Sequence, residues 1–92
     1  MKKRFQIGDI VSVCDISEGY DFKVTKVTDK EAVAEQQPRQ FGDKTVEPYL
    51  APIRMHREYE RNQIAPNWPV WNVKFIPDTT RWLKVCVKPA NE

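Results

Sequence analysis

Apolar and polar residues alternate most clearly in residues 22–36, where the pattern predicts an antiparallel β-hairpin around a turn at 28–31. Phe22 and Val24 share one face of the first predicted strand, but Val27 falls out of phase with them. A β-bulge between Val24 and Val27 would bring Val27 back to that face, and barrels use such bulges to bend strongly. We therefore expect a bent hairpin in this part of the chain.

A second alternating stretch predicts another hairpin, with strands at 70–76 and 81–87 and a turn at 77–80. Its core face is apolar and contains Trp71, Val73, Phe75, Leu83, Val85 and Val87. Its opposite face is mixed and contains Val70, Asn72, Lys74, Ile76, Trp82, Lys84, Cys86 and Lys88. The solvent face of this predicted hairpin therefore combines positive charge with one large aromatic ring.

Residues 5–13 are the most recognisable stretch of the chain. They combine an apolar anchor, a turn pair and a run rich in β-branched residues, namely Phe5 and Ile7, Gly8–Asp9, and Ile10–Val13. This pattern resembles the first strand of SH3-like barrels, including the tudor and KOW kinds, and the resemblance extends over residues 5–35. It implies a small antiparallel barrel with a binding face.

The rest of the chain is less regular. Residues 37–44 are polar and contain Pro38 and Gly42–Asp43, and residues 45–50 are expected to form a short strand, at an edge because Pro48 interrupts them. Residues 52–63 are either a short helix that starts at a proline or an irregular excursion. We therefore expect one all-β domain spanning residues 1–92. It is a small SH3-like barrel of about five antiparallel strands with at most one short helix (52–63), and its ends at 1–4 and 89–92 are flexible.

Composition and charge narrow the class of protein. The chain has 92 residues, 40% of them hydrophobic and 30% charged, which is typical of a globular domain. Its net charge of +2, from 15 basic and 13 acidic residues, is far below the excess of a dedicated duplex-DNA binder. No apolar run approaches the roughly 20 residues that span a bilayer. A cytoplasmic protein without a membrane segment is the expectation.

The residues that could carry chemistry are few. A zinc site needs four ligands, and the chain offers only Cys14, Cys86 and His56 as thiol or imidazole ligands. The first and last strands of SH3-like barrels often lie side by side, so the resemblance implies that Cys14 and Cys86 lie close together as reduced, partly buried thiols. Catalytic motifs and Gly-rich phosphate loops are absent from the sequence. We expect no enzyme activity, no cofactor and no metal.

The candidate binding residues form two groups. Three tryptophans lie within fifteen residues, beside several lysines, and Trp71 among them is expected in the core. The predicted binding face contains Trp82, Lys74, Lys84, Lys88, Asn72 and Trp68. A second, basic stripe would consist of Arg54, Arg57 and Arg61 if residues 53–63 were helical, although Glu58 and Glu60 could pair with it.

Two functions remain open on these grounds. The first is a non-enzymatic binding module, either a protein-interaction module or an accessory subunit, that uses an exposed aromatic and cationic face together with the edge strand at 45–50. The alternative is a nucleic-acid-binding small barrel that stacks the bases of single-stranded RNA or DNA on its aromatic rings. Weak net charge favours a protein partner, whereas the interleaving of rings and cations favours nucleic acid.

Overall fold

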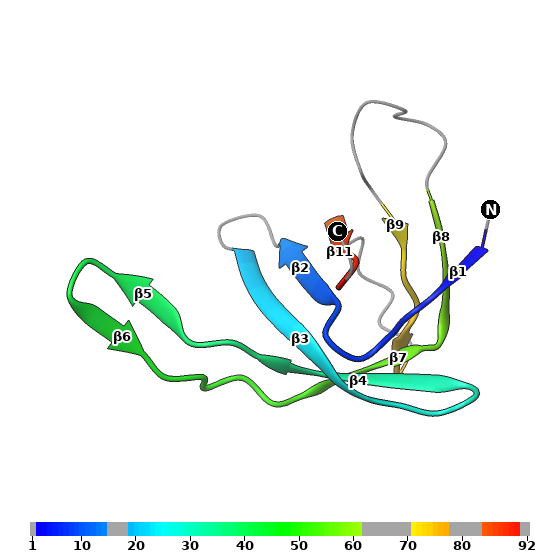
Figure 1. The fold of residues 1–92 in the computed structure, drawn as a ribbon, viewed down its shortest axis with the longest axis horizontal. Coiled ribbons are helices and arrows are strands. Elements are labelled where there is room, and N and C mark those ends of the chain that lie inside the picture. The colour runs from blue at the N-terminus through cyan, green and yellow to red at the C-terminus, as the bar shows by residue number, and fades with distance from the viewer. Residues whose placement is uncertain (1, 15–18, 62–70, 78–83, 91–92) are drawn as a thin grey trace.

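The computed structural model describes residues 2–14, 19–61, 71–77 and 84–90. These residues form strands and turns and no helix (Figure 1), so the all-β prediction is confirmed for them. Their strands belong to three sheets, of which the largest has six strands in the order β10-β7-β4-β3-β2-β11. Every pairing in the large sheet is antiparallel.

The six-stranded sheet curls into a half-barrel (Figure 1), as expected for a small barrel. Its strands are β2 (Ile10–Cys14), β3 (Gly19–Val27), β4 (Glu31–Gln36), β7 (Ile53–His56), β10 (Phe75–Ile76) and β11 (Lys84–Lys88). The concave side holds the core, which contains Phe5, Val11, Phe22, Val24, Ala32, Ala34, Met55, Tyr59, Val85 and Val87. We expected a barrel of about five strands, and this sheet has six.

The first predicted hairpin is confirmed with its bulge. Strands β3 and β4 pair so that Val24 lies opposite Ala34, while Lys26 lies opposite Val33. One residue of β3 is therefore extra, and this shift returns Val27 to the face that packs against the core.

The turn before β2 is also confirmed. The backbone N–H of Asp9 donates to the carbonyl of Gln6 at 3.1 Å, and Gly8 at the third position of this turn has a φ of 98°. A type II turn requires such a positive φ at this position, which explains the glycine. Phe5 is buried as predicted, but the expectation for Ile7 is wrong because its side chain occupies an exposed turn position.

The expected helix or excursion at 52–63 is wrong for the described part of that range. Residues Ile53–His56 form β7 and Glu58–Arg61 form β8, with a corner at Arg57. Met55 and Tyr59 are buried while their sequence neighbours are not, which is the period-two alternation of strands. Tertiary burial of these two residues outweighs the helix propensity that the sequence suggested.

The expected flexible start at 1–4 is likewise a strand over Lys2–Arg4, β1. It joins a three-stranded sheet with the order β1-β8-β9, in which β9 is Trp71–Asn72. Lys2 lies opposite Glu60 and Arg4 lies opposite Glu58. Opposite charges directly across an antiparallel pair favour the pairing, and Arg4 also donates to the backbone carbonyl of Asp29 at 3.2 Å.

The second predicted hairpin does not form among the described residues. Strand β9 pairs with β8, β10 pairs with β7, and β11 pairs with β2. The predicted faces nevertheless hold, because Val85 and Val87 are buried while Trp71, Val73 and Phe75 pack against the core. Alternation sets which face a side chain takes, but it does not choose the partner strand.

The two cysteines lie on neighbouring strands, as the barrel resemblance implied. Cys86 of β11 lies opposite Ser12, and Cys14 lies opposite Lys84, so the two thiols are diagonal neighbours. Both are free. Both thiols were expected to be partly buried. Cys86 is partly buried, whereas Cys14 is exposed near the end of its strand.

A two-stranded ribbon projects from the barrel along its long axis (Figure 1). It consists of β5 (Arg39–Phe41) and β6 (Lys44–Val46), joined by the two-residue turn Gly42–Asp43. Gly42 has a φ of 58° and Asp43 has no positive φ, which together define a type II′ hairpin turn. The polar stretch at 37–44 therefore contains β5 and the turn, and the edge strand expected at 45–50 is shorter and begins at Lys44.

Candidate functional site

The ribbon has two chemically different faces. Its register places Arg39 opposite Val46 and Phe41 opposite Lys44, so these four side chains lie on one side. We call Arg39, Phe41, Lys44 and Val46 the ribbon face. The other side carries the polar pair Gln40 and Thr45.

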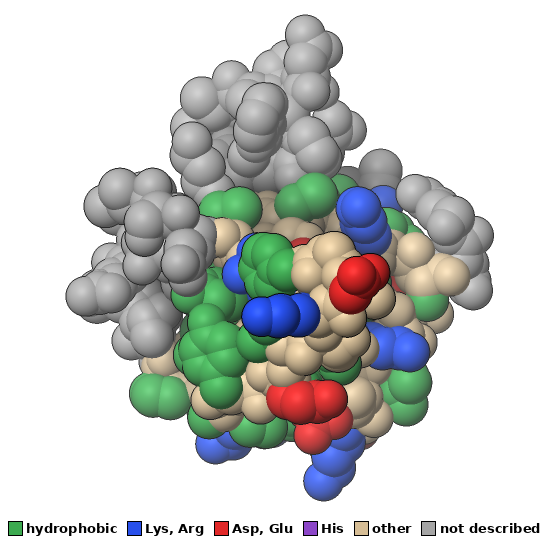
Figure 2. Space-filling model, turned by 90° about the vertical axis from the view of Figure 1, so that its left-hand side faces the viewer, with side chains coloured by type: hydrophobic (Ala, Val, Ile, Leu, Met, Phe, Trp, Pro, Cys, Tyr) green, Lys and Arg blue, Asp and Glu red, His purple; other side chains and the backbone are tan. Residues whose placement is uncertain are grey.

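Exposed apolar surface gathers on and next to the ribbon face. Of the five large hydrophobic side chains exposed among the described residues, four lie in residues 41–50, namely Phe41, Val46, Tyr49 and Leu50. Phe41 is 58% exposed and Tyr49 is 62% exposed. In Figure 2, which faces this end of the molecule, hydrophobic side chains lie beside lysine or arginine side chains. Such clustering of apolar side chains marks an interaction surface more often than scattered exposure does.

Arg39 is fixed among aromatic rings. Its guanidinium carbon lies 5.6 Å from the centroid of the Tyr20 ring and 5.3 Å from that of Phe41. Tyr20 also meets Tyr49 edge to face, with centroids 6.3 Å apart. No described residue forms an ion pair with Arg39 or Lys44. The cations of the ribbon face therefore have no acidic partner within the described part of the chain.

The base of the ribbon is tied to the barrel by a buried side chain. The amide oxygen of Gln36, at the end of β4, accepts hydrogen bonds from the backbone N–H groups of Tyr49 at 2.9 Å and Leu50 at 2.6 Å. The backbone N–H of Gln37 donates to the carbonyl of Asp21 at 2.9 Å. These contacts hold both ends of the projecting segment, so its exposed rings are presented from a fixed base.

A hollow of about 430 Å³ lies between the ribbon and the neighbouring ends of β2 and β3. Arg39, Gln40 and Phe41 line one side of it. On the other side, the Ser12 hydroxyl donates to the Asp21 carboxylate at 2.6 Å. The outer edge of β5 therefore borders this hollow.

The predicted tryptophan and lysine face is only partly described. Asn72, Lys74 and Lys88 are exposed, but they belong to different pairings: Asn72 lies opposite Glu60, and Lys88 lies opposite Ile10. Lys84 starts β11 opposite Cys14. Trp68 and Trp82 lie outside the described residues. The hairpin that was expected to unite these residues is absent from the described pairings.

The condition for the predicted arginine stripe is not met, because Ile53–His56 and Glu58–Arg61 are strands and not one helix. Arg54 on β7 donates to the carboxylate of Glu31 at 2.8 Å, across the β4–β7 pair. Arg57 turns to the backbone, where its Nε donates to the carbonyl of Phe5 at 2.6 Å and its Nη1 donates to that of Thr28. Arg61 ends β8 opposite Trp71.

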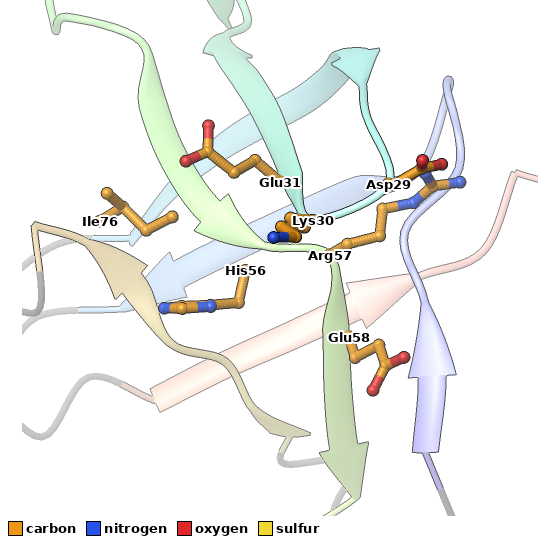
Figure 3. A pocket seen from close by; sticks show the side chains of 7 residues that line it. All are labelled: Asp29, Lys30, Glu31, His56, Arg57, Glu58 and Ile76. Atoms are coloured by element: carbon orange, nitrogen blue, oxygen red, sulfur yellow. The ribbon is translucent and has the colours of Figure 1, made fainter.

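A second hollow, of about 400 Å³, lies at the corner between β7 and β8 (Figure 3). It is lined by Asp29, Lys30, Glu31, His56, Arg57, Glu58 and Ile76. The side chains of His56, Glu31 and Glu58 point in different directions in Figure 3. The hollow therefore does not bring an acid and a base together, and its charges are mixed.

Sequence reasoning missed the ribbon face although a signal for it was present. Gly42–Asp43 is a two-residue hairpin turn pair, and the residues on either side of it alternate between the two faces. No sequence pattern predicts the contact between Arg39 and Tyr20. The two residues belong to β5 and β3, and their proximity depends on the tertiary fold.

No three His, Cys, Asp or Glu side chains of the described ranges are grouped so that they could hold a metal ion. The same ranges contain no helix of the length and apolar character needed to cross a membrane.

Comparisons of the chain with protein-family models, curated proteins and solved structures give no significant match.

Proposed function

We propose that the protein is a non-enzymatic protein-interaction module that binds its partner through the ribbon face and the adjoining Tyr49. The observation that carries this proposal is the gathering of four exposed large hydrophobic side chains in residues 41–50, beside two cations that have no acidic partner among the described residues. The partner is a protein segment that carries an apolar anchor and a carboxylate.

The charge of the projecting segment favours a protein over a nucleic acid. Residues 39–50 contain two basic residues, Arg39 and Lys44, and two acidic ones, Asp43 and Glu47, so their net charge is zero. Binding to a phosphate chain draws most of its affinity from an excess of cations. A segment without that excess suits a partner that presents a single carboxylate among apolar groups.

Phe41 and Arg39 have complementary roles in this proposal. The Phe41 ring is the apolar anchor, and buried aromatic side chains dominate interface energies. The guanidinium of Arg39 is held by two rings, so less conformational entropy is lost when it binds a carboxylate. Its planar fork suits bidentate pairing with a carboxylate, which an ammonium group does not reproduce.

A crosslinking experiment tests the proposal. Tyr49 is replaced by the photo-reactive benzoylphenylalanine, the protein is irradiated in lysate of its source cells, and the captured protein is identified and purified. Its affinity for the wild type and for three variants is then measured by calorimetry. We expect Phe41→Ser and Arg39→Gln to weaken binding by about tenfold to hundredfold, and Arg39→Lys to weaken it measurably despite the retained charge.

The matched control is Ile7→Ser, which removes an equally exposed apolar side chain outside residues 41–50 and should leave the affinity unchanged. Equal losses for Ile7→Ser and Phe41→Ser would reject the ribbon face. A labelled single-stranded oligonucleotide is titrated in parallel at two salt concentrations. Salt-dependent binding that Phe41→Ser abolishes would replace the protein partner with nucleic acid.

A further inference from the structure

The two outer edges of the ribbon are unpaired among the described residues. Phe41 and Lys44 flank the two-residue turn, and residues in that position exchange backbone hydrogen bonds. Because such pairs alternate along an antiparallel ribbon, Gln40 and Thr45 form the next, non-hydrogen-bonded pair. The backbone N–H and C=O of Gln40 therefore point out from the β5 edge, and those of Thr45 point out from the β6 edge.

The β6 edge is guarded against pairing with another copy of itself. A two-fold pairing centred on Thr45 would place Asp43 directly opposite Glu47 of the partner subunit, twice. Like charges directly opposite each other destabilise an antiparallel pair. Charges of this kind are a usual protection of an exposed strand edge.

The β5 edge has the opposite character. A two-fold pairing centred on Gln40 would place Arg39 opposite Phe41 of the partner subunit, and Phe41 opposite the partner subunit's Arg39. Each such pair can form a cation–π contact, because arginine already stacks on this ring within one chain. No like charges meet directly in this register. Pro38 would lie opposite Gly42 of the partner subunit and has no N–H to donate, so the pairing depends mainly on the N–H and C=O of Gln40.

We infer that two copies of the chain associate through their β5 edges into a four-stranded sheet with the order β6-β5-β5-β6. The contact is isologous, so the same edge serves both copies and the assembly closes at two. The ribbon projects beyond the barrel (Figure 1), and its β5 edge borders a hollow rather than another described strand. Both ribbon faces then lie on one side of the joint sheet.

This inference goes beyond the proposed function and does not depend on it. The ribbon face could bind another protein in a monomer, and the β5 edge could pair without any other partner. The strands involved are only three residues long, so the interface is small. Interfaces below about 1,200 Å² belong to weak, reversible complexes. We expect a dimer that forms at concentrations between about 10 µM and 1 mM.

Sedimentation equilibrium of the purified 92-residue chain over that range tests the inference. The wild type should change from monomer to dimer, whereas Gln40→Pro should weaken association by about tenfold or more, because it removes the outward N–H that pairs across the two-fold axis. Thr45→Pro is the matched control. It places the same residue at the equivalent position of the other edge and should dimerise like the wild type. A wild type that stays monomeric at about 1 mM, or a Gln40→Pro variant that dimerises equally well, overturns the inference.

Amide hydrogen exchange of the wild type provides a readout that needs no variant. The Gln40 amide should become protected as the protein concentration rises, while the Thr45 amide should exchange at the same rate throughout. Protection of the Thr45 amide instead of the Gln40 amide would place the contact at the β6 edge and overturn the inference. The oligonucleotide and crosslinking results leave both readouts unaffected.

Discussion

The carboxylate of Asp9 accepts a hydrogen bond from the backbone N–H of Ala90 at 2.8 Å, across 81 residues of sequence. Its second oxygen accepts from the backbone N–H of Gln6 at 2.9 Å. Asp9 is only 3% exposed, so it joins the turn before β2 to the segment after β11 inside the protein. One side chain thereby links the turn before β2 to the segment that follows the neighbouring strand β11.

Replacement of Asp9 should therefore be costly. Asp9→Ala removes both acceptors and leaves two backbone donors without partners, so we expect the free energy of unfolding to fall by about 2–4 kcal/mol. Asp9→Asn keeps the shape and one acceptor oxygen, and it should lose less than Asp9→Ala. Urea denaturation followed by tryptophan fluorescence measures both variants. Equal stability of Asp9→Ala and the wild type would show that the two hydrogen bonds contribute nothing.

Gly8 should resist substitution for two separate reasons. Its φ of 98° is unfavourable for other residues, and an added Cβ would lie 3.2 Å from the Cβ of Ala90. We expect Gly8→Ala to lower the free energy of unfolding by about 1–2 kcal/mol. Gly19→Ala is the control, because Gly19 has no positive φ and its nearest neighbour, the Cys14 sulfur, lies 3.4 Å away. The double variant Gly8→Ala/Ala90→Gly should recover part of the loss, since it relieves the contact but not the backbone strain.

Arg54 on β7 and Arg57 at the β7–β8 corner should contribute differently to the free energy of unfolding. Arg57 donates to two backbone carbonyls of different segments, so Arg57→Ala should cost about 2–3 kcal/mol in the free energy of unfolding. Arg54 forms an exposed ion pair with Glu31, so Arg54→Ala should cost about 0.5 kcal/mol or less. Thermal and urea unfolding of the two variants at equal ionic strength checks this order. A larger loss for Arg54→Ala would contradict it.

The two thiols should react at different rates. Cys14 is exposed and Cys86 is half-buried, so a thiol reagent added to the folded protein should modify Cys14 first. The fast phase should disappear in Cys14→Ser and persist in Cys86→Ser, as followed by absorbance and mass spectrometry. In denaturant the two cysteines should react alike. Faster modification of Cys86 in the folded state would reverse the assignment.

The local pattern of the sequence was a good guide to strands and their faces. The out-of-phase Val27 was enough to locate the bulge in β3, and alternation placed Val85 and Val87 in the core. Pairing was harder, because β11 joins β2 across more than 70 residues and nothing in the alternation of 84–88 names its partner. The sequence suggested a helix at 52–63 because the charged residues of that range are good helix formers. The described residues of the range form strands instead, because Met55 and Tyr59 are buried in the core.

The candidate site was harder still to foresee. The tryptophans of the predicted binding face, Trp68 and Trp82, lie outside the described ranges. The rings that contact Arg39 are Phe41 and Tyr20, and Tyr20 in turn contacts Tyr49. These residues meet only after β3, β4 and the ribbon are in place. A hairpin turn at Gly42–Asp43 could have been expected, but the position of Arg39 over Tyr20 depends on tertiary structure.

The ribbon supplies none of the buried side chains that make up the core, all of which lie before Arg39 or after Val46. Mutations between β4 and β7 are therefore spared the selection that acts on packing. Such a segment can drift, lengthen or exchange its recognition residues while the barrel beneath it keeps its structure. Descendants of this chain could acquire new partners by rewriting residues 39–46 alone, and a protein engineer could use the same segment as a graft site.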